Sequence, residues 1–331
     1  VEAAMRLIAH NEERFPKKIR AGKAGKQKVR FQYFEDCYKE NAFLAEDIRQ
    51  TVQNGVPLSE IAVLFRTNMQ PRALMEYMVS ANLAFQTKDR IPDIYEHWIA
   101  RDFFTYIRIA QGSDSRADFL SIMNRPKRYI GRDSLPDETV CFDEWVKLYE
   151  EQPWIAERIE KLWYDLKHLS RLSPYAAINY IRRGIGYDDY LAEYAEYRNA
   201  NKEDFYEVAD EILASAKGYR TFEEWFAHIE EYRQELKRLA QEKRRNQNAV
   251  TFATLHSAKG LEFTKVYLID VNEGVMPYKK AVLKQDVEEE RRLFYVGMTR
   301  AKESLTICSV KKMRGKEVEL SRFIKEAGKE P

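Results

Sequence analysis

The stretch VTFATLHSAKGLEF, from Val250 to Phe263, decides the expected fold. Its first residues are apolar and predict a buried strand, while the residues after Thr254 are small, cationic or hydroxyl-bearing. In parallel-sheet proteins, ligands bind in the crevice beyond the carboxyl ends of the strands. Small residues at that edge let backbone N–H groups approach an anion, and His256 and Lys259 add positive charge. The stretch therefore favours a phosphate site, although an ordinary strand-to-loop turn with a solvated lysine fits it equally well.

A second stretch, EEERRLFYVGMTRAKE (Glu288–Glu303), has the spacing of a basic helix that ends at Thr299-Arg300-Ala301. An arginine held at the end of a helix projects from a rigid support and can neutralise charge on a transferring phosphoryl group. In the alternative interpretation, residues 288–292 are a solvated charge run and Arg300 only complements the helix dipole.

A third stretch, IAVLFRTN (Ile61–Asn68), begins with a continuous apolar run, which is typical of a strand buried on both faces. Arg66 follows this run and is a second candidate phosphate contact, and Phe65 could lie against a base. Equally, Phe65 could belong to the core and Arg66 to the surface.

The rest of the chain predicts an α/β domain that is interrupted by helices. Alternating strands and helices before residue 90 indicate a parallel sheet: strands at 28–34, 61–65 and 83–87, and helices at 40–53 and 72–81. From residue 136 to about residue 245, apolar residues recur at helical spacing. Strands resume at 250–254, 265–271 and 304–310. We therefore expect the α/β domain at residues 1–125 and 248–331, with a helical insert at 126–247.

Composition excludes several other classes of protein. The chain has 331 residues, which suits two domains, and 55 basic against 53 acidic residues give a net charge of only +2. Bulk charge thus makes no case for nucleic-acid binding. Three widely spaced cysteines predict neither a zinc site nor secretion, and no apolar run predicts a membrane span, so a cytoplasmic protein is expected. Because the chain begins with Val1 inside an expected helix, we expect it to be part of a longer polypeptide.

The three stretches resemble motifs IV, V and VI of superfamily 1 DNA helicases of the UvrD/Rep/PcrA type. The segment MNRPKRYIG (Met123–Gly131) resembles the entry into the accessory domain of that family, and only the helical insert is poorly matched. The resemblance implies a RecA-like (P-loop NTPase-type) parallel-sheet motor domain with an all-helical insert. The implied activity is ATP-dependent 3′ to 5′ DNA translocation or unwinding.

The resemblance also implies roles for individual residues. Arg66 and Arg300 would be the catalytic arginines that reach the γ-phosphate, and Glu262 and Gly260 would contact the ribose and phosphate side of the nucleotide. Phe65 stands where the family often has a tyrosine that stacks on adenine, so stacking would survive without the hydroxyl contact. The candidate contacts to single-stranded DNA are Asn124, Lys127, Thr254, His256 and Tyr278.

Two elements of such a motor are missing from this sequence. It has no GxxxxGK[ST] phosphate loop and no apolar strand that ends in an Asp-Glu pair. In the family these belong to the first motor domain, which would hold most of the ATP and Mg²⁺. We therefore expect this chain alone to be inactive and to need its own N-terminal motor domain, with single-stranded and duplex DNA as further partners and neither a metal site nor a membrane contact of its own.

Two other functions stay open. One is the motor of an AddA/RecB-type helicase–nuclease, which would require a nuclease domain farther along the polypeptide. The other is a non-catalytic module that binds DNA or a protein partner through the insert. The presence of both Arg66 and Arg300 argues against such a module, because pure binding needs neither.

Overall fold

The computed structural model describes residues 1–12, 29–241 and 248–328 and divides into two compact units. One unit combines Val1–Pro92 with Tyr232–Pro331, and the other is Asp93–Glu231. The helical unit therefore begins and ends earlier in the sequence than the insert expected at 126–247. Those insert limits stay a prediction.

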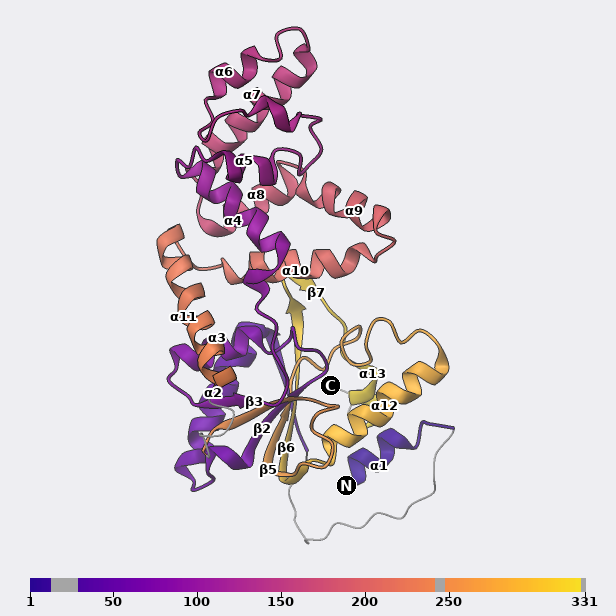
Figure 1. Cartoon of the computed structure of the whole chain (residues 1–331). Helices are drawn as coiled ribbons and strands as arrows, with labels where there is room; N and C mark the ends of the chain where they lie inside the picture. The colour runs from indigo at the N-terminus through magenta and orange to yellow at the C-terminus, as the bar shows by residue number, and fades with distance from the viewer. Residues whose placement is uncertain (13–28, 242–247, 329–331) are drawn as a thin grey trace. The chain divides into compact units, whose positions relative to one another are not determined.

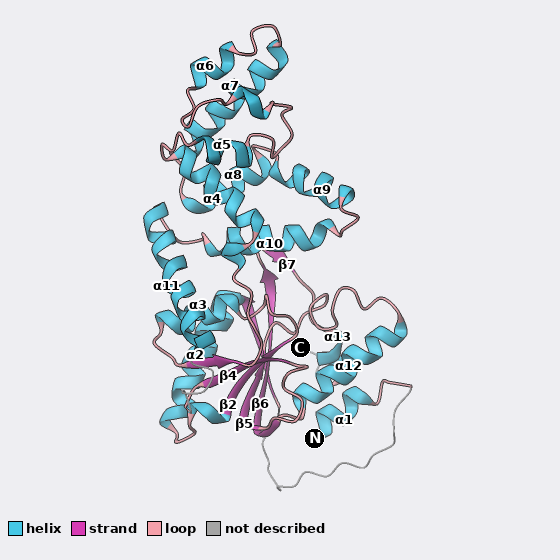
Figure 2. Ribbon diagram, viewed as in Figure 1, coloured by secondary structure: helices cyan, strands magenta, loops and turns pink. Residues whose placement is uncertain are grey.

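A parallel sheet forms the centre of the first unit (Figure 2). Its strands lie in the order β1–β6–β5–β2–β4–β3, and these neighbours pair in parallel, while β7 pairs with β6 in the antiparallel sense. This confirms the expected α/β fold with a parallel sheet. The strands are β1 (Arg30–Asp36), β2 (Ile61–Phe65), β3 (Phe85–Thr87), β4 (Val250–Thr254), β5 (Phe263–Leu268), β6 (Ala301–Met313) and β7 (Lys316–Glu317).

Helices cover both faces of this sheet (Figure 1). Helices α2 (Cys37–Gln53) and α3 (Arg72–Ser80) lie on one face, where α2 packs against β1 and β6. On the other face lie α12 (Lys284–Met298), α1 (Glu2–Ile8) and α13 (Arg322–Glu326). The alternation of strand and helix thus places the sheet between two layers of helices.

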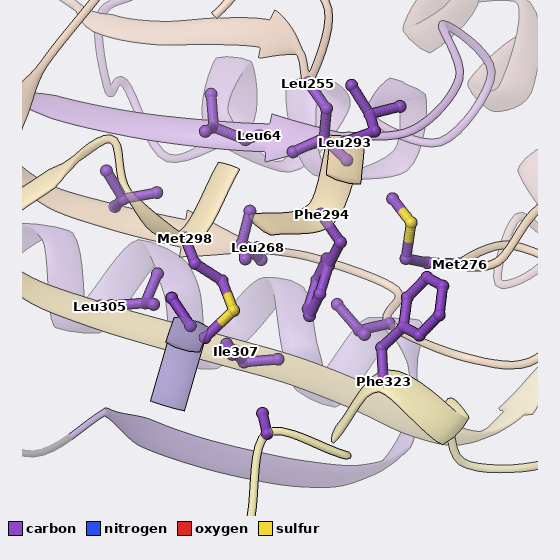
Figure 3. Packing of buried hydrophobic residues seen from close by; sticks show 14 of the residues in the cluster. Leu64, Leu255, Leu268, Met276, Leu293, Phe294, Met298, Leu305, Ile307 and Phe323 are labelled. Carbon is purple, nitrogen blue, oxygen red and sulfur yellow. The ribbon is translucent and has the colours of Figure 1, made fainter. Parts of the chain in front are cut away.

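A hydrophobic core fills the space between the sheet and α12 (Figure 3). Phe294 and Met298 of α12 meet Leu268 and Ile307 of the sheet there. Gly297 faces the same core, and a Cβ atom at this position would overlap Leu255 Cδ2 and lie 3.3 Å from Leu268 Cδ2. The missing side chain therefore lets α12 approach both the sheet and the segment that follows β4.

The second unit is helical, and no strand occurs in residues 93–231, all of which the structure describes. Its core is rich in aromatic rings: Trp98 lies 5.1 Å from Tyr194 and 5.7 Å from Phe205, centroid to centroid. The tyrosines near residue 190 thus serve helix packing. The helices are α4 (Trp98–Ala110), α5 (Arg116–Ile122), α6 (Phe142–Lys147), α7 (Pro153–Leu169), α8 (Pro174–Arg183), α9 (Tyr187–Tyr197), α10 (Lys202–Ser215) and the start of α11 (Phe222–Gln241).

None of the helices in the described residues combines the length and the apolar character that crossing a membrane requires.

Candidate functional site

Arg66 follows the carboxyl end of β2 and is held by a carboxylate from α12. Its Nη2 atom donates to Glu290 Oε1 at 2.8 Å and its Nε atom donates to Glu290 Oε2 at 2.9 Å. The two side chains are only 20% and 10% exposed, so this two-pronged ion pair is largely removed from water. The backbone N–H groups of Arg66 and Thr67 both donate to Gln70 Oε1, at 2.8 and 2.7 Å. Both the main chain and the guanidinium of Arg66 are therefore fixed.

Tyr278 and His256 complete the surroundings of Arg66. The guanidinium carbon of Arg66 lies 5.2 Å from the centre of the Tyr278 ring, and the Tyr278 N–H donates to Glu290 Oε2 at 3.1 Å. Partial desolvation lowers the pKa of His256 below its ordinary value, and the positive charges of Arg66 and Lys259 lower this pKa further. Burial and these charges therefore favour the neutral form of His256, which lies within the electrostatic reach of Arg66.

Arg300 follows α12 and has a different environment. Its Nε atom donates to the Val296 carbonyl, its Nη1 atom to the Leu261 carbonyl and its Nη2 atom to Thr299 Oγ1, each at 3.0 Å. All three acceptors are neutral, and no carboxylate in the described part of the chain forms an ion pair with this guanidinium. The side chain is partly exposed, so a fixed and uncompensated positive charge faces solvent.

The two arginines lie at opposite ends of the sheet strands. Arg66 comes after β2, whereas Arg300 comes before β6 and its carbonyl accepts from Phe263 N, at the start of β5, at 2.9 Å. Because β2, β5 and β6 are parallel, these positions are opposite edges. The loop at 255–262 joins the two ends: Leu255 N donates to Phe65 O, and Leu261 O accepts from Arg300. The structure thus links the two arginines through this loop and does not bring them onto one partner.

The candidate nucleotide contacts differ in accessibility. Gly260 has a left-handed φ of +83°, no heavy atom lies within 4 Å of the position a Cβ would take, and Glu262 is exposed. Phe65, however, is only 1% exposed and packs against Phe252 with ring centroids 6.5 Å apart. The expectation that Phe65 stacks on adenine is therefore corrected, because a ring buried in the core offers no face to a base. Gly260 and Glu262 are therefore accessible to a ligand, whereas Phe65 is not.

Thr254, a candidate DNA contact, is used within its own loop. It is 9% exposed, its Oγ1 atom accepts from Ser257 N at 3.2 Å, and its N–H donates to Asp89 Oδ2 at 2.8 Å. The Ser257 hydroxyl also donates to Asp89. Thr254 and Asp89 thus fix the start of the loop, and this burial corrects the expectation that Thr254 contacts DNA. His256, two residues on, is exposed and remains a candidate.

Asn124 and Lys127 belong to the helical unit. The amide of Asn124 is used within its own loop, whereas the side chain of Lys127 is exposed. Asn124 Oδ1 accepts from Arg128 N and Ile130 N at 3.2 and 3.0 Å, and its Nδ2 donates to Ile130 O at 2.8 Å, so its amide shapes the loop. Lys127 is exposed, with Nζ 4.5 Å from the centre of the Tyr129 ring. It belongs to a basic and aromatic cluster that consists of Lys127, Tyr129, Trp154 and Arg158. Of these four residues, the sequence pattern had indicated only Lys127.

Glu290 is not among the predicted site residues, because it stands in a run of charges for which a solvated helix face was one of two open interpretations. It precedes Leu293, Phe294 and Gly297 by three, four and seven residues, and this spacing places it on the buried face of α12. Attention to that spacing could have identified it. Residues 1–12, 29–241 and 248–328 contain no group of three or more His, Cys, Asp or Glu side chains that could hold a metal ion.

Comparisons with known proteins agree with the fold and the motifs. The YjcD protein of Bacillus subtilis (strain 168) is 26% identical over 98% of this chain and 44% of its own length. An ATP-dependent DNA helicase PcrA of Staphylococcus epidermidis is 29% identical over 98% of this chain and 47% of its own length. The ATP-dependent DNA helicase Rep of Salmonella typhimurium is 27% identical over 98% and 52%, respectively.

The chain spans about half the length of the curated relatives it matches, and it matches the C-terminal part of the helicases among them. The family model described as the UvrD-like helicase C-terminal domain matches residues 1–312, nearly the whole sequence. By this match, and with the parallel sheet and motif loops in place, the chain belongs to the UvrD-like helicase C-terminal domain family.

Proposed function

We propose that this chain is the second motor domain, with its accessory insert, of an ATP-dependent 3′ to 5′ DNA helicase or translocase. Relatives that match it over nearly its whole length are named as ATP-dependent DNA helicases. The observation that carries the proposal is the guanidinium of Arg300, which is fixed by three neutral acceptors at the end of a rigid helix. A positive charge held in this way is suited to an anion that another domain presents.

In this proposal the nucleotide and its Mg²⁺ are held mainly by a phosphate-loop domain outside this chain. ATP hydrolysis supplies the free energy for movement along DNA. Arg300 stabilises the negative charge that develops on the transferring phosphoryl group, an effect of about 10³ to 10⁵ in rate for arginines of this kind. Exposed Glu262 and open Gly260 line the same end of the loop at 255–262 and contact the ribose and phosphate side. Arg66 follows β2 at the opposite edge of the sheet, so a contact between Arg66 and the same phosphate stays a prediction.

Contact with single-stranded DNA falls to two exposed candidates, His256 and Lys127, and to the partly exposed Tyr278. His256, and Tyr278 beside Arg66, belong to the sheet unit, and Lys127 belongs to the basic and aromatic cluster of the helical unit. Cations and aromatic rings together suit a nucleic-acid strand, because phosphates attract the former and bases stack on the latter. Backbone contacts of this type carry no sequence information, so we expect binding without sequence preference.

The first test is the ATPase activity of the purified 331-residue chain, with and without single-stranded DNA. We expect no hydrolysis above background, because the sequence holds no phosphate loop. The matched arm joins the chain to a phosphate-loop domain of a relative and should restore DNA-stimulated hydrolysis. DNA-stimulated turnover by the isolated chain would overturn the assignment to the second motor domain.

A further inference from the structure

The basic and aromatic cluster of the helical unit combines two cations with two exposed aromatic side chains. Tyr129 and Trp154 are 55% and 49% exposed, and their ring centroids are 6.0 Å apart. Arg158 Cζ lies 5.2 Å from the centre of the Tyr129 ring and 4.9 Å from that of Trp154. Lys127 Nζ lies 4.5 Å from the centre of the Tyr129 ring. Each ring therefore has a cation beside it and still presents a large part of its surface to solvent.

The loop that carries Tyr129 is held in place by hydrogen bonds on both sides of this residue. Tyr129 has a φ of +61°, in the left-handed region that bulky side chains rarely adopt. Asn124 Oδ1 accepts from Arg128 N and Ile130 N, which flank Tyr129, at 3.2 and 3.0 Å. The buried guanidinium of Arg128 donates to the Met123 carbonyl at 3.0 Å. Backbone strain persists where the surroundings impose it, so the loop holds the exposed Tyr129 side chain in a defined place.

The two cations of the cluster have no acidic partner in the part of the chain that the structure describes. Arg158 Nη1 donates to the Arg128 carbonyl at 3.3 Å, and neither Arg158 nor Lys127 forms an ion pair there. Lys161, which lies on the same helix α7 as Arg158, is paired with Asp165 at 2.9 Å. The cluster thus leaves two positive charges available to an anion from outside the chain.

A single strand of DNA has both of the features that this surface matches. Its phosphates are attracted by cations, and its unpaired bases can stack on aromatic rings. In a duplex the bases already stack on each other, so the exposed rings would gain little from it. An acidic peptide would engage the cations and leave the rings without flat partners. Exposed rings beside uncompensated cations therefore favour a strand with unpaired bases.

We propose that the basic and aromatic cluster is a base-stacking site for single-stranded DNA. Tyr129 and Trp154 each stack on an unpaired base, and Lys127 and Arg158 contact the adjacent phosphates. This inference rests on the proposed function, because it takes DNA as the partner, and it adds three residues to the contact already given to Lys127. Since every base has a flat face, binding at this site is independent of base sequence.

The experiment measures binding of a fluorescently labelled oligothymidine to the full 331-residue chain by anisotropy. The same strand with abasic positions keeps the phosphates and lacks bases, and a duplex of equal length keeps the bases stacked. Tyr129→Gly and Trp154→Ala each remove a ring, and Trp154→Phe keeps one. The matched control is Tyr164→Ala, because Tyr164 is 63% exposed on the same helix as Trp154 and its ring lies against Trp163, outside the cluster.

Loss of either ring should weaken binding of the oligothymidine about ten-fold and leave the weaker binding of the abasic strand unchanged. Trp154→Phe should keep most of the affinity, and Tyr164→Ala should bind as the unmodified chain does. Glycine adopts a positive φ without strain, so Tyr129→Gly should lose affinity without a lower melting temperature. The oligothymidine should also quench the tryptophan fluorescence of the unmodified chain more than that of Trp154→Phe.

The cations give an independent prediction. Lys127→Gln and Arg158→Gln should weaken binding of the oligothymidine and of the abasic strand alike. Each should lower the slope of log affinity against log salt concentration by about 0.7, the value for one phosphate contact on a single strand. Lys161→Gln is the matched control, and it should leave the slope unchanged because the charge of Lys161 is paired with Asp165.

Three results would contradict the stacking site. If both ring variants bound the oligothymidine as tightly as the unmodified chain, or if no variant and no unmodified chain bound it, the cluster would not be a DNA site. The ATPase test of the joined polypeptide would still decide the proposed function separately. An equal loss of duplex and single-strand binding in the ring variants would exclude stacking on unpaired bases. Polyglutamate or anionic lipid vesicles that competed as strongly as unlabelled oligothymidine would assign the cluster to another partner.

Discussion

Arg66 and Arg300 are two arginines of one α/β unit, and they differ in whether a carboxylate compensates their charge. Arg66 is paired with a carboxylate and mostly buried, whereas Arg300 is held by two backbone carbonyls and a hydroxyl. In the sequence both simply follow an expected strand or helix. The difference shows that the neighbours of an arginine, drawn from distant parts of the chain, decide whether its charge is available. We therefore expect the two residues to respond differently to substitution.

The largest expected effect is on hydrolysis. In a polypeptide that places this chain behind a phosphate-loop domain, Arg300→Ala should lower kcat by about 10³-fold or more and leave most DNA binding intact. Steady-state ATPase assays and DNA titrations check this. Arg292→Ala is the control, because Arg292 lies on the same helix and pairs with Glu289 at 3.0 Å. Turnover within a few-fold of the unmodified protein would show that Arg300 is not the phosphate-contacting arginine.

The next largest effect tests whether α12 supports both arginines. Gly297 lies between Glu290 and Arg300 on this helix, against Leu255 and Leu268. Gly297→Val should cost about 1–3 kcal/mol of folding free energy through overpacking, and it should disturb the surroundings of both arginines. Urea denaturation gives the free energy. Gly131→Ala serves as the control, since its Cβ would meet only Tyr149 Oη at an ordinary 3.4 Å. An unchanged midpoint for Gly297→Val would mean that α12 tolerates displacement from the sheet.

Substitution of Arg66 should lower the stability of the chain more than substitution of Arg300, which is the reverse of the order expected for activity. Arg66→Ala leaves the shielded carboxylate of Glu290 with only the Tyr278 N–H, which should cost about 1–2 kcal/mol. Arg300→Ala removes bonds to neutral acceptors at a partly exposed site and should cost about 0.5–1 kcal/mol. Thermal melting of both variants of the chain measures the difference. Equal losses of stability in the two variants would show that the carboxylate partner of Arg66 makes no difference to the folded chain.

The smallest effect is a shift in one titration. His256 has a pKa below its ordinary value because of desolvation and then of Arg66. Arg66→Gln should raise this pKa, whereas Arg300→Gln should leave it unchanged. Because the pKa of His256 is lower in the folded chain, the unfolded chain binds the imidazole proton more readily. Protonation of His256 therefore favours unfolding as the pH falls through the pKa that His256 has in the unfolded chain. Arg66→Gln should weaken this pH dependence of stability. NMR titration of the imidazole decides the point, and an equal shift in both variants would place Arg300 near His256.

Local pattern was sufficient for much of the fold. The apolar runs at Ile61–Phe65 and Val250–Thr254 coincide with β2 and β4, because a strand buried on both faces needs an uninterrupted apolar stretch. The same burial decides between the two interpretations of Phe65: the last residue of such a strand is still in the core, which disagrees with the adenine contact that the resemblance implied.

Partners that lie far apart in the sequence were not predictable in this way. Glu290 meets Arg66 across 224 positions, and Asp89 meets Thr254 across 165. Such contacts depend on strand order and on the path of α12, and neither follows from local periodicity. The candidate site was therefore identified as a set of cations, without the carboxylate that distinguishes one cation from the other.

The strand order also has a consequence for how the chain is made. Strand β2 lies between β4 and β5, so both of its neighbours are synthesised only after the whole helical unit. Until then the apolar segment IAVLF has no pairing partner on either side, and a nascent chain halted in the helical unit exposes it. Non-local pairing of this kind slows folding. We expect truncations that end before Val250 to aggregate, while the helical segment that separates β3 from β4 can change in length without altering the sheet.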